Sequence, residues 1–117
     1  MFPSLPAIRV YLATGVTDMR KSINGLSILV AEHLEQDPFS GHLFAFCNRK
    51  RDIVKVLYWD RNGFCLWQKR LEKDTYKWPE TGGDALPLGT RELHWLLEGL
   101  SLVGQNAHHE QAFSTVT

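Results

Sequence analysis

Cysteine, long apolar runs and net charge are all scarce in this chain. Its two cysteines, Cys47 and Cys65, have no C-x-x-C spacing, so we expect buried free thiols in a reducing compartment rather than disulfides or a thiolate metal site. No apolar run approaches the roughly 20 residues that span a bilayer, and the first residues lack the pattern of a signal peptide. These absences predict a cytoplasmic protein without membrane contact.

Residues that could carry out chemistry are scattered rather than clustered. Asp52 and Asp60 bracket one predicted strand without a third carboxylate beside them, and His108 and His109 are neighbours in a polar tail. Phosphodiester chemistry commonly uses clustered carboxylates with divalent metals, and two adjacent histidines do not close a metal site. The serines lie in no nucleophile-elbow context. We therefore expect a binding protein without metal or cofactor, and not an enzyme.

Hydrophobic periodicity predicts alternating short strands and two helices. Thr17 and Thr90 supply hydroxyls for the helix N-caps, Asp37-Pro38 ends the first helix, and Gly99 or Gly104 ends the second. The predicted elements are, in chain order, strand 7–13, helix 18–36, strands 42–48, 53–60 and 64–71, a short edge strand at 86–88, and a helix from residue 90. The three middle strands form a meander, whose second turn carries the hairpin signal Asn-Gly.

This pattern predicts one α+β domain over residues 1–104, with a small, mainly antiparallel sheet, and a polar, flexible tail over residues 105–117. The middle strand of the meander is apolar on both faces. We expect both helices on one face of the sheet, which leaves an apolar outer face around Trp59 and Trp67 for a partner or a second copy of the chain. Helices on both faces would account for the same pattern. Gly25, in mid-helix, is expected where the helix approaches the sheet closely.

Positive charge is concentrated although the chain is neutral. The 13 basic residues match the 13 acidic ones, yet nine basic and four acidic residues lie between Arg49 and Lys77. Such a concentration on one small sheet favours contact with a polyanion, and a solvated face paired with the chain's own acidic helices is the alternative. The candidate DNA-contacting residues are Arg49, Lys50, Arg51, Lys55, Arg61, Lys69 and Arg70.

Aromatic residues are interleaved with these basic residues. Tyr58, Trp59, Phe64 and Trp67 could stack on unpaired bases if they face outward, with burial in the core as the alternative. Separately, the Arg20-Lys21 pair falls in the first turn of the predicted helix, where the helix dipole disfavours cations. A contact outside the helix could account for that pair.

Three segments make the chain resemble a known family: TDMRK (residues 17–21), DPFSG (37–41) and YWDRNGFCLWQKRLE (58–72). With KWP and the closing LLEGL, they resemble the small Orf2-like accessory protein of the insertion-sequence-sixty-six family, often labelled TnpB, over roughly residues 5 to 102. The resemblance implies a role in DNA transposition beside a separate, larger transposase, without strand-transfer chemistry of its own.

The expected partners are therefore DNA and the transposase of the same element. The alternative is an adaptor that docks the transposase, or forms a homodimer, without touching DNA. The resemblance brings no established binding residues, so the candidate DNA contacts rest on charge placement alone.

Overall fold

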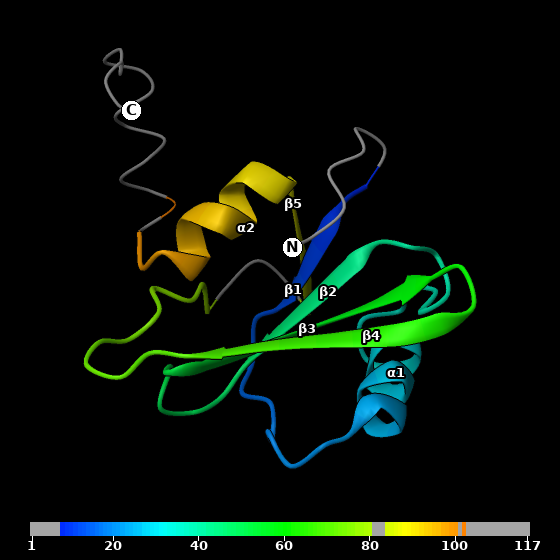
Figure 1. Cartoon of the computed structure of the whole chain (residues 1–117), viewed down its shortest axis with the longest axis horizontal. Helices are drawn as coiled ribbons and strands as arrows, with labels where there is room; N and C mark the ends of the chain where they lie inside the picture. Colours follow the sequence, from blue (N-terminus) through cyan, green and yellow to red (C-terminus); the bar gives the residue numbers. More distant parts are fainter. Residues whose placement is uncertain (1–7, 81–83, 101, 103–117) are drawn as a thin grey trace.

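The computed structural model of the chain describes residues 8–80, 84–100 and 102. In chain order, its elements are β1 (Val10–Ala13), α1 (Ile23–Glu32), β2 (Leu43–Cys47), β3 (Ile53–Asp60), β4 (Gly63–Arg70), β5 (Ala85–Leu88) and α2 (Thr90–Leu97). They form an α+β fold, which confirms the predicted class (Figure 1). The predicted tail over residues 105–117 and the alternative helix end at Gly104 lie outside the described residues.

The five strands form one mixed sheet in the order β4-β3-β2-β1-β5. β2, β3 and β4 are antiparallel neighbours, which confirms the meander, and β5 pairs antiparallel with β1. β1 and β2 are parallel, so the chain must cross from one end of the sheet to the other between them, and α1 is that crossover. Pro87 lies opposite Tyr11 on the edge strand β5, where a missing N–H is tolerated.

The helices cover opposite faces of the sheet, so the prediction that both pack on one face is wrong (Figure 1). On one side, Leu93 and Leu96 of α2 join the core formed by Val54 and Val56 of β3. On the other side, α1 packs over a second core, whose buried members are Ala13, Leu26, Val30, Leu34, Phe44, Phe46 and Leu57. All five residues of β2 are buried, because a central strand between two helical layers has no face toward water.

α1 begins five residues later than its sequence pattern predicts. Thr17 is buried and is not the N-cap, because its backbone N–H donates to the carbonyl of Cys47 at 2.9 Å. The Asp18 carboxylate accepts from the Arg20 backbone N–H at 2.9 Å, which folds this segment into a turn. The helix therefore starts at Ile23, after Ser22 as N-cap.

Glycine positions explain two further details of the helices. Gly99 has φ 86°, and the Leu100 N–H reaches back to the Trp95 carbonyl at 3.0 Å, so Gly99 ends α2 as predicted. Thr90 is the first helical residue rather than the N-cap, which is Gly89. At Gly25 an added Cβ would lie 3.4 Å from the Lys21 Cβ, so the expected close approach of helix to sheet is wrong.

The segment after β4 has no regular structure but is anchored to the sheet at several points. Leu71 and Tyr76 donate their backbone N–H groups to the carbonyls of Asp52 and Arg51, at 2.8 and 2.7 Å. The buried Trp78 indole donates Nε1–H to the carbonyl of Ala13 at 2.9 Å. These bonds hold residues 71–80 against the ends of β1 and β3.

Candidate nucleic-acid interface

Three connecting segments meet at one end of the sheet. β1 and β2 are parallel and both end there, β3 begins there, and the antiparallel β4 ends there. The three segments are the β1–α1 loop (residues 14–22), the β2–β3 turn (48–52) and the loop after β4 (71–80). They are held together by the hydrogen bonds described above that are donated by Thr17, Leu71, Tyr76 and Trp78. We call this region, with the last two residues of β4, the basic end.

The two ends of the sheet carry opposite charge. The basic end holds nine basic and five acidic residues, namely Arg20, Lys21, Arg49, Lys50, Arg51, Lys69, Arg70, Lys73, Lys77, Asp18, Asp52, Glu72, Asp74 and Glu80. At the far end, residue 9 and residues 32–42, 60–63 and 89–92 contain five acidic residues and three basic residues. A neutral chain is thus polarised along its strands.

The β2–β3 turn presents two of the predicted contacts to solvent on a rigid base. Arg49 and Lys50 are exposed at its tip. The Asn48 side chain accepts from the backbone N–H groups of Asp52 and Ile53, both at 3.0 Å, and donates to the Asp52 carboxylate at 2.7 Å. The side chain of Asn48 therefore adds to the backbone bonds that already cross the turn and fixes the position of its tip.

Arg51 lies beneath the loop that follows β4. Its side chain is only 18% exposed, and its Nη2 approaches the carboxylate of Glu80 at 3.8 Å. Its Nη1 is buried, without a hydrogen-bond partner among the described residues. Arg51 thus faces the protein more than the solvent.

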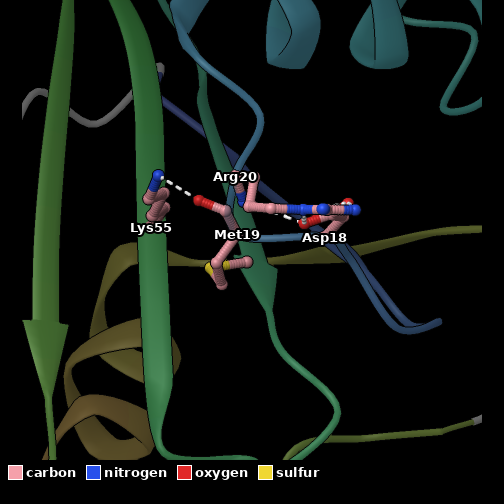
Figure 2. A network of polar contacts seen from close by, with 4 residues as sticks. All are labelled: Asp18, Met19, Arg20 and Lys55. Atoms are coloured by element: carbon pink, nitrogen blue, oxygen red, sulfur yellow. Dashed lines mark hydrogen bonds and ion pairs between the residues drawn. The ribbon is translucent and has the colours of Figure 1, made fainter.

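Two predicted lysines are used within the fold. The Lys55 ammonium donates to the carbonyl of Met19 at 2.8 Å, as Figure 2 shows, and to that of Lys21 at 3.3 Å. The Lys69 ammonium donates to the carbonyl of Leu97 at 3.0 Å. A cation at the last turn of α2 is favoured by the helix dipole, so Lys69 stabilises the end of that helix.

The last two predicted residues differ in position. Arg70 is exposed at the basic end and pairs with Glu72, with 3.1 Å between Nε and Oε2. Arg61 is exposed in the β3–β4 turn, at the opposite end of the sheet, so the structure does not bring it together with the other six.

The structure adds basic residues that the candidate set omitted. Arg20 and Lys21 are exposed in the β1–α1 loop, and Lys73 and Lys77 in the loop after β4. Arg20 forms a forked pair with Asp18, with Nη2 2.7 Å from Oδ2 and Nε 3.1 Å from both oxygens (Figure 2). These bonds lower the pKa of Asp18 to about 2. Arg20 and Lys21 were left out of the candidate set because the sequence pattern does not predict that β1 and β2 pair in parallel. That pairing is what places the β1–α1 loop beside the β2–β3 turn.

The aromatic residues lie away from the basic end or in the core. Trp59, Phe64 and Phe39 form a cluster near the β3–β4 turn, with ring centroids 5.0 to 5.3 Å apart. Phe39 is 57% exposed. Trp67 lies opposite Val56 and packs against the core on the α2 side, so the expectation of one apolar face around both Trp59 and Trp67 is wrong.

Comparison with known protein families identifies one match. The family model described as IS66 Orf2 like protein matches residues 8–107. The chain belongs to the IS66 Orf2-like family. Among similar proteins, the uncharacterized protein y4hO of Sinorhizobium fredii is 39% identical over 100 residues, covering 86% of this chain and 87% of its own. The uncharacterized protein y4jC of the same organism is 34% identical over 93 residues, 80% of each chain. No solved structure matches.

The match to the IS66 Orf2-like family spans the whole sheet, both helices and the basic end. This family is associated with transposition. Within the part of the chain that the structure describes, no group of three or more His, Cys, Asp or Glu residues could hold a metal ion. None of the described helices is long and apolar enough to cross a membrane.

The two thiols of this IS66 Orf2-like protein are free. Cys47 is buried as predicted, and burial raises its pKa, against a smaller opposing effect of the nearby Arg51. Cys65 is only half-buried, so the prediction of burial holds for one thiol and not for the other.

Proposed function

We propose that this IS66 Orf2-like protein is a non-catalytic accessory factor in transposition, and that its basic end contacts the DNA backbone. The observation that supports this proposal is that nine basic and five acidic residues, from three connecting segments and the end of β4, meet at one end of a neutral chain. Phosphate contacts from Arg and Lys supply sequence-independent affinity and fix how a protein lies on the duplex. The transposase of the same element is the proposed protein partner.

The exposed tip of the β2–β3 turn gives the most direct test. Labelled duplex DNA would be titrated with the wild type and with R49Q/K50Q, by fluorescence anisotropy over a series of salt concentrations. Each lost phosphate contact lowers the log–log salt slope by about 0.9, so we expect R49Q/K50Q to lower it by about 1.8. The matched control is R9Q/R91Q, which removes two exposed cations far from the basic end. Equal slopes for the wild type and R49Q/K50Q would contradict the proposal.

A second candidate function is the adaptor without DNA contact. The exposed Phe39 ring and its packing on Trp59 and Phe64 favour it, because an aromatic cluster reaching the surface is typical of protein interfaces. Purified transposase and duplex DNA, offered separately, distinguish the two functions. If F39A abolishes capture of transposase and the wild type shows no salt-dependent binding to duplex DNA, the adaptor is correct and DNA contact is not.

A further inference from the structure

The β1–α1 loop is fixed beside the β2–β3 turn by backbone and side-chain bonds from two strands. The Thr17 N–H donates to the carbonyl of Cys47, the last residue of β2, at 2.9 Å. From β3, the Lys55 ammonium donates to the carbonyl of Met19 at 2.8 Å (Figure 2) and to that of Lys21 at 3.3 Å. The loop is therefore held at both of its halves against the strands that carry the turn.

One of the two cations of this loop, Arg20, has a constrained side chain. Asp18 engages Nε and Nη2 of Arg20, while the Arg20 side chain is 91% exposed, and Nη1 takes no part in the pair. The stem of Lys21 lies over Gly25, with its Cβ and Cγ 3.4 and 3.5 Å from where a Cβ on that glycine would be. Side chains that are already ordered lose less conformational freedom when they bind.

We infer that the β1–α1 loop is a second contact with the DNA backbone, made by Arg20 and Lys21, and that Lys55 positions this loop rather than touching DNA. The inference rests on the proposed function. It differs from the contacts expected from charge counting, which include Lys55 and omit the loop. With Arg49 and Lys50, the loop gives the duplex two adjacent basic segments on one rigid support.

The first experiment compares R20Q/K21Q with R49Q/K50Q and with the control R9Q/R91Q, in the same anisotropy assay over salt. We expect R20Q/K21Q to lower the salt slope by about 0.9 to 1.8, for one or two lost phosphate contacts, which corresponds to roughly 8- to 60-fold weaker binding at 0.1 M salt. If R49Q/K50Q lowers the slope but R20Q/K21Q behaves like R9Q/R91Q, the loop contact is overturned and the proposed function stands. If the wild type shows no salt-dependent binding, the proposed function fails and this inference with it.

The second experiment separates positioning from contact at Lys55. K55M should weaken DNA binding several-fold in the wild-type background and speed amide hydrogen exchange at residues 17–22, because the loop loses both bonds to β3. In the R20Q/K21Q background, K55M should cause no further loss. In the wild-type background, K55R keeps a cationic donor and should therefore retain part of the affinity that K55M loses. An equal loss in both backgrounds would mean that Lys55 contacts DNA itself. Urea unfolding of each variant shows whether it is folded under the assay conditions.

Discussion

Replacing Trp78 by phenylalanine should destabilise the protein through one long-range hydrogen bond. The Trp78 indole is buried and donates to the carbonyl of Ala13, the last residue of β1, at 2.9 Å. Phenylalanine keeps an aromatic ring but removes the donor, which leaves a buried carbonyl with one partner fewer. Such a loss costs about 1–3 kcal/mol, and the cavity left by the smaller ring adds about 1 kcal/mol at roughly 24 cal/mol per Å³.

The expected total is about 2–4 kcal/mol of unfolding free energy. Urea unfolding followed by circular dichroism measures it directly. With a slope of about 2 kcal/mol per M, the middle of the usual range for urea, the midpoint should fall by roughly 1–2 M. Amide exchange at residues 71–80 should also accelerate, because the bond ties this loop to β1.

The matched control is Trp59→Phe. Trp59 is half-buried and packs its ring on Phe39 and Phe64, with centroids 5.0 Å from each, and a phenylalanine ring retains much of that contact. W59F should cost under about 1 kcal/mol. If W78F costs no more than W59F, the indole bond does not hold the loop, and the anchoring described for residues 71–80 is incorrect.

Three further results are expected. The Asp18 carboxylate should titrate at about 2 by NMR, and in R20Q its midpoint should return toward the ordinary 3.8; an unchanged midpoint would show that the forked pair is not formed in solution. Burial raises the pKa of Tyr76 to about 12 from 10, so its contribution to stability is present below pH 10 and lost as pH rises toward 12. The unfolding free energy of Y76F should therefore fall less than that of the wild type between pH 10 and 12, and an identical fall in both would contradict this. Gly25→Ala should raise the unfolding free energy by about 0.5–1 kcal/mol, since the nearest atom to its new Cβ lies at an ordinary contact distance of 3.4 Å; a lower urea midpoint would mean that the Lys21 stem cannot yield.

The order of elements could be predicted from the sequence, but the layering could not. The meander follows from alternating apolar residues and an Asn-Gly turn, both local signals. Placing α2 required knowing that β5 pairs beside β1, a contact between distant parts of the chain. The five-residue apolar run of β2, LFAFC, was the available clue, because a strand buried on both faces needs cover on both sides.

The candidate site, too, could be predicted from the sequence only in part. Charge counting identified the segment from Arg49 to Lys77, which supplies most of the basic residues of the basic end, but it could not find the partner of each cation. Lys55 and Lys69 donate to carbonyls 36 and 28 residues away in the sequence, and no local sequence pattern predicts such bonds. The start of α1 was misplaced for a related reason: Thr17 and Asp18 look like a helix cap, while the bond from Thr17 to Cys47 keeps the chain along the sheet.

The place of β1 in the sheet has a consequence for the order of folding. β2, β3 and β4 pair with their neighbours in sequence and can close quickly, whereas β1 needs the α1 crossover and then β5 from near the other end of the chain. Until β5 docks, β1 presents an unpaired edge of N–H and C=O groups to other chains. β5 carries a proline opposite Tyr11, which cannot donate to a further strand. We therefore expect β5 to complete the sheet last and also to protect its edge against pairing with other chains.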